Sequence, residues 1–134
     1  MPDRSTYTSD EVESCRDNCD ALLAAWGAND IEDSTLESLV FGQAVVVLHT
    51  WFGHRRRELE GDDGNALNEV RVIADSIVDN DAVLRVEGPI SWVPERTVLR
   101  LAVGDDIELT ANGFERLTAA YLAAIEATYP EAAG

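Results

Sequence analysis

The stretch from Ser34 to Glu60 constrains the fold of this chain more than any other. It opens as Ser-Thr-Leu-Glu, runs through apolar residues from Leu39 to Gly53, and ends in a basic cluster at 54–57. A hydroxyl residue followed three positions later by Glu is a capping box, which begins a helix. Three β-branched residues at 45–47 favour a strand, but the stretch is far too long for one. We therefore predict a helix.

Apolar residues fall on every side of this predicted helix, so periodicity alone does not orient it. A helix that is apolar all round must be covered all round. We expect it to form the buried centre of the domain, or to line a homodimer interface as well. Its apolar run of 15 residues, Leu39 to Gly53, is shorter than the roughly 20 that cross a membrane, so no membrane partner is expected.

Amphipathic helices are predicted on both sides of the central one. Residues 8–27 begin with a capping box at Thr8 and Glu11 and repeat apolar residues at helical spacing. Residues 65–78 and 112–128 show similar stripes. We expect residues 1–7 and 131–134 to be loose tails of a single domain spanning 1–134.

Between these helices, the hydrophobic period changes to two. Residues 84–87 and 90–92 alternate around a Gly-Pro turn, which predicts a hairpin. Residues 107–109 are predicted as a short strand, and Thr97–Val103, which fits a strand or a helix, is assigned as a strand. The predicted fold class is α+β: a buried central helix, amphipathic helices around it, and a small antiparallel sheet, in the order α-α-α-β-β-β-α.

Charge limits the partners of this chain. It has 26 acidic and 10 basic residues, all of the latter Arg, for a net charge of −16. Nucleic-acid affinity comes largely from basic residues that displace counterions, so direct binding to DNA or RNA is disfavoured, as is binding to an anionic membrane. Three interpretations stay open: biased composition, adaptation to a salty cytoplasm as in a halophile, or a functional acidic surface.

The first helix carries the residues that we select for the functional interpretation. Its carboxylates form a candidate partner-binding face, composed of Asp10, Glu11, Glu13, Asp17 and Asp20. An acidic face complements a basic protein surface. The leading hypothesis is a non-enzymatic interaction module, in its sharpest form an inhibitor or regulator that mimics nucleic acid and occupies a basic nucleic-acid-binding cleft. The other partner considered is a second copy of the chain.

The alternative is a small enzyme or anion-binding protein with its pocket at the basic cluster. Guanidinium groups bind carboxylates and phosphates through paired hydrogen bonds, so His54, Arg55, Arg56 and Arg57 are candidate anion ligands, with His49 nearby. The competing interpretation is a charge-compensated helix end. No phosphate-binding loop, nucleophile elbow or zinc-protease motif is present, and we assign no catalytic residue.

The only Cys and His residues of the chain are Cys15, Cys19, His49 and His54. Two His five apart on a helix do not point together, and both Cys fall on an apolar stripe. We therefore expect two buried thiols, with no metal and no cofactor. The start of the chain lacks an apolar signal-peptide core, which together with free thiols predicts a cytoplasmic protein.

Two smaller expectations concern polar side chains on the surfaces of the predicted helices. Asn68, Glu69, Arg71 and Asp75 are residue types that catalyse, but their spacing is also that of a solvated helix face. We place Asn68, Arg71 and Asp75 on the outer face of the third helix. Arg56 and Glu60 are four apart and are expected to pair on the surface.

Overall fold

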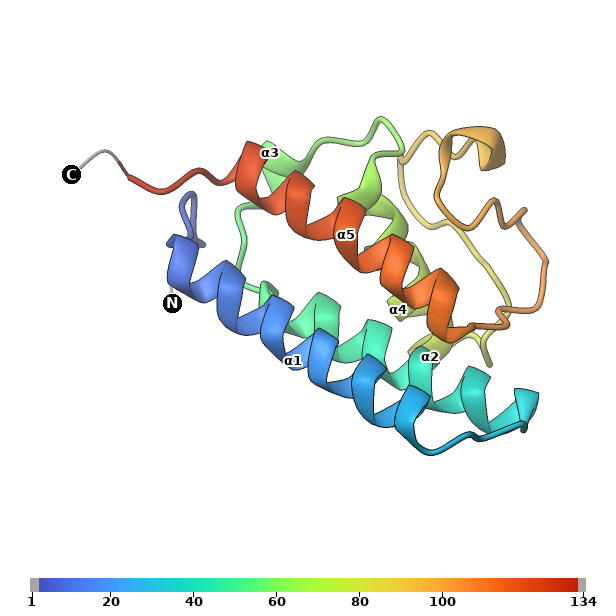
Figure 1. Ribbon diagram of the computed structural model, residues 1–134. Helices are drawn as coiled ribbons and strands as arrows, with labels where there is room; N and C mark the ends of the chain where they lie inside the picture. The colour runs from blue at the N-terminus through green and yellow to red at the C-terminus, as the bar shows by residue number, and fades with distance from the viewer. Residues whose placement is uncertain (1–2, 133–134) are drawn as a thin grey trace.

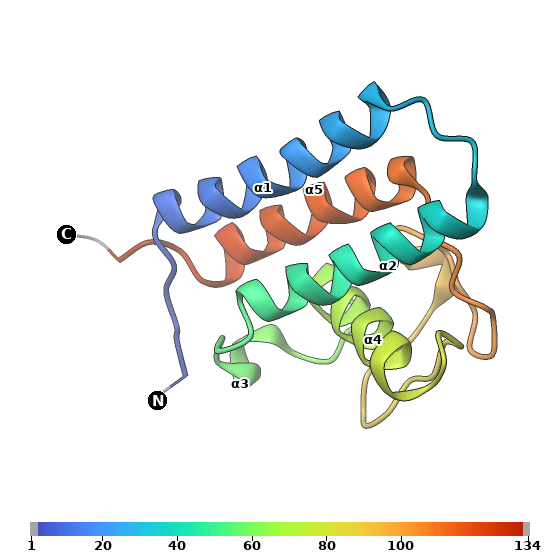
Figure 2. The ribbon, with the colours of Figure 1, turned by 90° about the horizontal axis from the view of Figure 1, so that it is seen from below.

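Five α-helices carry the fold in the computed structural model, which describes residues 3–132. They are α1 (Ser9–Ala28), α2 (Ser34–Trp51), α3 (Arg57–Glu60), α4 (Ala66–Asp79) and α5 (Ala111–Thr128), with a single 3₁₀ turn, η1 (Pro94–Arg96). The long helices α1 and α5 lie side by side, and α4 packs against α2 (Figure 1, Figure 2). α1 packs on α5, α5 on α4 and α4 on α2, whereas α1 and α2 touch only sparsely.

Side-chain caps set where the helices begin. The predicted capping box is confirmed: the amide of Glu11 donates to Thr8 Oγ1 at 3.1 Å, and the amide of Thr8 donates to the Glu11 carboxylate at 2.7 Å. In α2 the cap is Asp33 rather than Ser34, because Asp33 Oδ1 accepts the amide of Leu36 at 3.0 Å. The sequence therefore located this helix start to within one residue.

The stretch from Ser34 to Glu60 is not one helix. α2 ends at Trp51, and the amide of Gly53 turns back to the carbonyl of Thr50 at 3.0 Å. A short loop follows before the single turn α3. This break matters because it carries the side chain of Arg55 into the interior.

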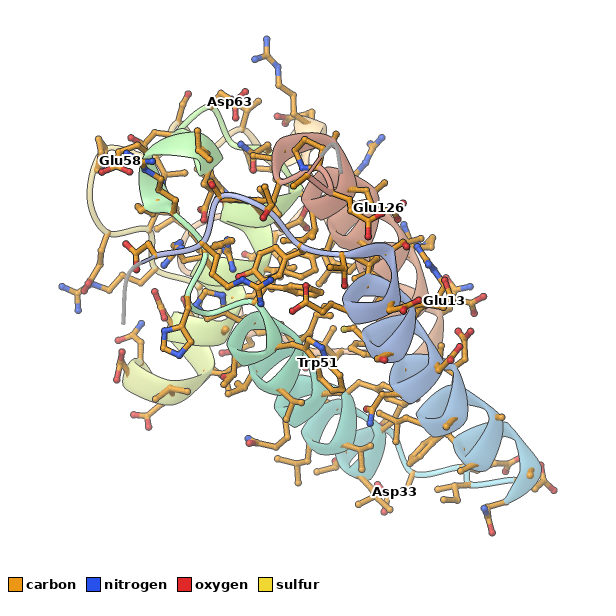
Figure 3. The ribbon with its side chains drawn as sticks, turned by 90° about the vertical axis from the view of Figure 1, so that its left-hand side faces the viewer. Glu13, Asp33, Trp51, Glu58, Asp63 and Glu126 are labelled. Carbon is orange, nitrogen blue, oxygen red and sulfur yellow. The ribbon has the colours of Figure 1, made fainter. Side chains whose placement is uncertain are left out.

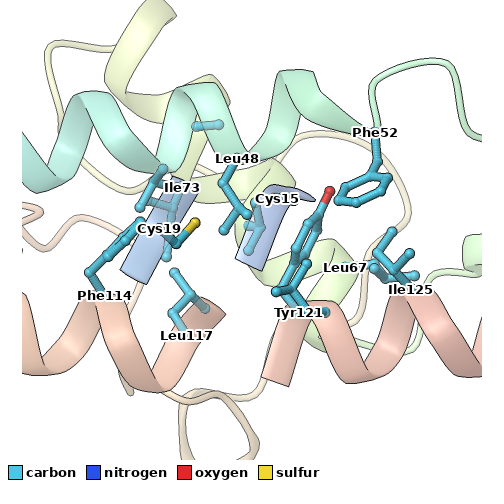
Figure 4. Close-up of a cluster of buried hydrophobic side chains, with 14 of the residues drawn as sticks. Cys15, Cys19, Leu48, Phe52, Leu67, Ile73, Phe114, Leu117, Tyr121 and Ile125 are labelled. Atoms are coloured by element: carbon cyan, nitrogen blue, oxygen red, sulfur yellow. The ribbon is translucent and has the colours of Figure 1, made fainter. Parts of the chain in front are cut away.

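The core fills the space between α1, α2, α4 and α5. Figure 4 shows its members converging from all four helices and from the loop after α2; the labelled ones are Cys15, Cys19, Leu48, Phe52, Leu67, Ile73, Phe114, Leu117, Tyr121 and Ile125. Most are fully buried. Each large apolar side chain buried here contributes about 1.5–3 kcal/mol to folding, and α5 supplies several of them.

The predicted α+β fold is wrong, because residues 3–132 contain no strand and no sheet. The segment from 80 to 110 is extended coil with one 3₁₀ turn, and a single antiparallel bridge joins Val83 to Asp106. Its alternating apolar residues do face the core: Leu84, Ile90 and Leu109 are buried. The alternation arises here because one side of an extended chain is buried against helices, and it does not require a neighbouring strand.

Side chains replace the missing strand partners in this segment. The buried carboxylate of Glu69, on α4, accepts the amides of Val98 at 2.8 Å and Leu99 at 2.9 Å. The indole of Trp92 donates to the carbonyl of Leu101 at 2.8 Å. A backbone φ of +56° at Arg100 also breaks the extended conformation that a strand over 97–103 requires. The backbone is thus satisfied without a sheet.

The segment before α1 is held against the domain. The amide of Arg4 donates to the carbonyl of His54, and the amide of Arg56 donates to the carbonyl of Arg4, both at 2.7 Å. Tyr7 is buried. Residues 3–7 are therefore anchored where a loose tail was expected, and residues 1–2 and 133–134 of the expected tails lie outside the described part. No helix within 3–132 has the length and apolar character to cross a membrane.

Candidate functional site

Four of the five predicted acidic residues share one exposed stripe of α1. Successive spacings of three, four and three residues place them on the same side of the helix; they are Asp10, Glu13, Asp17 and Asp20. Glu13 shares Arg16 with Glu126 of α5, at 2.6 and 2.8 Å, and Figure 3 shows Glu13 and Glu126 on neighbouring helices. Among residues 3–132, no basic side chain lies within ion-pair distance of Asp17 or Asp20.

Glu11, the fifth predicted residue, lies off this stripe. Its carboxylate receives two hydrogen bonds from the guanidinium of Arg4, at 2.6 and 2.8 Å, as well as the amide of Thr8. The hydrogen bonds from Arg4 lower the pKa of Glu11 to about 2 and outweigh the opposing effect of burial. Glu11 therefore fixes the N-terminal segment and does not join the other four.

The basic cluster does not converge on one point. His54 is exposed, and Arg56 extends into solvent beside Glu58 at 3.1 Å. Arg57 binds Asp62 at 2.5 Å. Arg55 points inward, and its side chain is completely buried. Arg57 also lies 3.7 Å from the carboxylate of Glu60, which Arg55 binds, whereas His54 and Arg56 stay in solvent. Anion binding by these residues stays a prediction.

Arg55 belongs to a buried polar network centred on Glu60. The Glu60 carboxylate accepts from Arg55 Nε at 2.9 Å, from Arg71 Nε and Nη2 at 3.0 and 2.7 Å, and from Asn68 Nδ2 at 2.7 Å. Arg55 Nη1 also donates to the hydroxyl of Tyr121 at 3.0 Å. The expected surface pair of Arg56 with Glu60 is therefore wrong, because α3 turns Glu60 into the interior.

Electrostatics explain how this network tolerates burial. Burial raises the pKa of Glu60, but hydrogen bonds from Arg71 and the charge of Arg55 outweigh it and hold the pKa at about 2. Burial has the opposite effect on nearby His49, where it lowers the pKa. Burial and, after it, the charges of Arg55 and Arg71 lower the pKa of His49 to about 4. His49 is thus neutral at pH 7, and its buried Nδ1 has no hydrogen-bond partner among the described residues.

The polar residues of α4 are mostly not on an outer face. Asn68 and Glu69 are buried, and Arg71 is only a quarter exposed. Burial raises the pKa of Glu69 in spite of the two loop amides that it accepts. Asp75 alone is exposed as expected. Asn68 and Glu69 anchor loops, a role that helical spacing did not reveal because loop positions follow from tertiary contacts.

The most unusual surface is the outer side of α2. Every exposed residue of this helix is uncharged, and four are large apolar side chains: Leu36, Leu39, Val47 and Trp51, between 39% and 62% exposed. We call the side formed by Leu36, Leu39, Val40, Gln43, Val46, Val47, Thr50 and Trp51 the α2 face. The chain is 27% charged, which corresponds to about five charged residues in a helix of 18. Among Asp, Glu and Arg, α2 contains a single residue, Glu37. The Glu37 carboxylate accepts a hydrogen bond from the amide of Ala111.

Two hollows flank the α2 face. The larger, about 360 Å³, lies between α2 and the segment before α5; Leu39, Gly42, Ile77, Ile107 and Leu109 contribute apolar walls. The smaller, about 100 Å³, lies along the loose seam between α1 and α2, where Leu22 faces Val47 and Trp51. Figure 3 shows Trp51 at this seam. α2 therefore stands as an apolar ridge between two depressions.

The sequence contained a signal for this surface. Apolar residues on all sides of α2 required a cover on all sides, and the structure provides one on the inner side only. The prediction of a fully buried helix is corrected accordingly. The individual exposed residues were not predictable, because they depend on which side α4 and α5 cover.

The two cysteines are free and buried, as predicted. The hydrogen bond to Cys19 and burial raise the pKa of the Cys15 thiol. His49 and His54 do not join them, and within residues 3–132 no three His, Cys, Asp or Glu side chains are grouped as metal ligands. Both thiols line the small hollow beside α2.

No family model, curated protein or solved structure matches this chain.

Proposed function

We propose that the protein is a non-enzymatic interaction module that docks on a basic partner surface through the acidic stripe of α1. The observation that carries the proposal is the alignment of Asp10, Glu13, Asp17 and Asp20 on one exposed side of a rigid helix. From Asp10 to Asp20 the stripe extends about 15 Å. A partner with regularly placed Arg or Lys side chains meets several carboxylates at once.

The distribution of arginine supports this proposal. Seven of the ten Arg residues, at positions 4, 16, 55, 56, 57, 71 and 85, form ion pairs within the chain. Two of these, Arg55 and Arg71, form ion pairs with the buried carboxylate of Glu60. The positive charge is thus largely engaged. On α1, Glu13 is paired with Arg16, and the carboxylates of the stripe that are unpaired within residues 3–132, among them Asp17 and Asp20, keep their field. Such a field accelerates association with a basic partner and favours it over acidic ones.

A basic nucleic-acid-binding cleft is the partner surface that fits this chemistry best. It presents cations spaced to bind phosphates, and the stripe presents anions on a helix that already holds them in place. A protein that binds such a cleft through the acidic stripe competes with nucleic acid and thereby acts as a regulator. Ionic attraction between exposed groups falls with added salt, so the complex has a steep salt dependence.

A charge-matched pair of variants tests the proposal. The stripe variant carries Asp10→Asn, Glu13→Gln, Asp17→Asn and Asp20→Asn. The control carries Asp79→Asn, Glu95→Gln, Asp106→Asn and Glu108→Gln, at exposed positions on α4 and the loops. Each variant has a net charge of −16 + 4 = −12. The probe is a labelled arginine-rich peptide, whose binding is measured by fluorescence anisotropy at low, moderate and high salt.

We expect the stripe variant to bind the peptide about ten-fold more weakly than the control at moderate salt. Exposed ion pairs contribute about 0.2–1 kcal/mol each, and 1.4 kcal/mol corresponds to a factor of ten in affinity. Equal losses in both variants show that only net charge matters and contradict the proposal. Binding that does not change with salt contradicts it as well.

A further inference from the structure

We infer that the α2 face is a homodimer interface, in which two copies of the chain pack their α2 helices against each other. The face covers the helix from Leu36 to Trp51, about 22 Å at 1.5 Å per residue. Exposed apolar residues normally occur singly on a surface, whereas a continuous apolar patch marks an interaction site. This surface is distinct from the acidic stripe of α1, and the inference does not depend on the proposed function.

Charge identifies the occupant as a second copy. The α2 face has no carboxylate to pair with a basic partner, so a basic surface docked there loses hydration without compensation. Two copies that each carry a charge of −16 repel one another over most orientations. When the two α2 faces meet, the residues of the two ridges that lie opposite each other are uncharged, and carboxylates occur only in the walls of the larger hollow, at Glu37 and Glu108. This face therefore allows self-association with the least electrostatic cost among the exposed sides of the described helices.

Shape supports the same conclusion. A two-fold interface uses one patch twice, so that the patch must be complementary to itself. The α2 ridge lies between two hollows, and two such ridges fit side by side with each ridge in a hollow of the other copy. Leu39 lies at the edge of the larger hollow and Val47 at the edge of the smaller. Both are placed to enter the partner's depressions.

Size is compatible with a stable dimer. A standard interface buries about 800 Å² of each partner, which is close to a tenth of the 7585 Å² surface of this chain. The four large apolar side chains of the α2 face are 39% to 62% exposed, and a dimer interface on this side covers them together with the walls of the two hollows. Because the rest of the surface remains strongly acidic, dimerisation strengthens as salt screens the repulsion between copies. This is the opposite of the salt dependence proposed for the basic partner.

Analytical ultracentrifugation of the full chain tests the inference at 20, 150 and 500 mM NaCl and at 1–100 μM protein. One copy has a mass of 14.6 kDa, so the dimer is 2 × 14.6 = 29.2 kDa. We expect dimers whose proportion rises with salt. Val47→Glu introduces a charge at the interface of both copies and is expected to weaken dimerisation at least a hundred-fold.

Val78→Glu is the matched control. It makes the same substitution at a valine of α4 that is 65% exposed, compared with 53% for Val47, and is expected to leave dimerisation within about two-fold of the original chain. Glu favours helix, and circular dichroism confirms that both variants fold. Comparable weakening by both variants overturns the inference.

Cross-linking adds a positive test. Gln43 lies in the middle of the α2 face, so Gln43→Cys is expected to form a disulfide between copies under mild oxidation, and Val78→Cys is not. A chain that stays monomeric at 100 μM and 500 mM NaCl, or a dimer that forms no disulfide through Gln43→Cys and persists in Val47→Glu, overturns the inference. In either case a different molecule or no molecule covers the α2 face.

Discussion

Replacing Glu60 by Gln tests the buried network most directly. The substitution preserves the shape of the side chain but removes the charge that faces Arg55 and Arg71. The side chains of Arg55 and Glu60 are both completely buried, and hydrogen bonds of 2.7–3.0 Å join the Glu60 carboxylate to three donor side chains. In the variant, the Arg55 charge stays in the interior without a counterion.

The loss of stability follows both from the buried ion pair and from the pKa of Glu60. Removing one partner of a buried ion pair costs about 3–5 kcal/mol. Independently, the pKa of Glu60 falls from 4.5 to about 2 on folding, and at about 1.4 kcal/mol per unit this corresponds to about 3 kcal/mol at neutral pH. We therefore expect Glu60→Gln to lower the free energy of unfolding by roughly 3–4 kcal/mol.

Urea denaturation at pH 7, followed by circular dichroism, measures this loss. With a slope of about 1–3 kcal/mol per molar urea, the midpoint is expected to fall by about 2 M. The control is Glu58→Gln on the same short helix, where the side chain is 78% exposed beside Arg56; its expected cost is below about 0.5 kcal/mol. A cost below about 1 kcal/mol for Glu60→Gln refutes the reasoning.

The pH dependence provides a second check on the same residue. Because folding depresses the pKa of Glu60, its stabilisation is complete above 4.5 and is lost as the pH falls from 4.5 towards 2. Glu60→Gln has no such contribution to lose. The difference in stability between the original chain and the variant should therefore shrink over this range, and a constant difference contradicts the assignment.

The remaining predictions concern His49 and Gly64. Folding lowers the pKa of His49 from 6.5 to about 4, so its contribution to stability is complete above 6.5 and decreases as the pH falls from 6.5 to 4; denaturation of His49→Gln should show a flatter profile there, and an unchanged profile contradicts the buried neutral state. Gly64 has a φ of +86°, and an added Cβ lies 2.3 Å from the Ser91 carbonyl oxygen. Gly64→Ala is therefore expected to cost about 2–4 kcal/mol by urea denaturation. Gly88→Ala, at φ +79° in open space, should cost only about 1 kcal/mol, and equal costs show that the contact with Ser91 is unimportant.

Local sequence patterns located four of the helices. The capping box at Thr8, the apolar stripes of α1, α4 and α5, and the length of the Ser34 stretch all depend on neighbours within about four residues. These interactions form in the same way wherever the helix later packs. The sequence also placed Cys15 and Cys19 in the core as free thiols, because both lie on the apolar stripe of α1.

Long-range contacts decided the coil between α4 and α5. Alternating apolar residues looked like strands, and the same alternation arises when an extended chain lies on helices. The deciding partner is the Glu69 carboxylate, about thirty residues earlier in the chain, which accepts the amides of Val98 and Leu99. No local pattern shows that a carboxylate on a helix will take the place of a neighbouring strand.

The candidate surfaces divide in the same way. Composition and helical spacing placed Asp10, Glu13, Asp17 and Asp20 together, since one helix is enough to align them. Tertiary structure buried Arg55 and left His54 and Arg56 exposed, because only the fold brings Glu60 and Tyr121 to the guanidinium of Arg55. It also exposed one side of α2, because α4 and α5 cover only the other. The sequence thus determined which side chains share a helix face, and packing determined which faces remain available for partners.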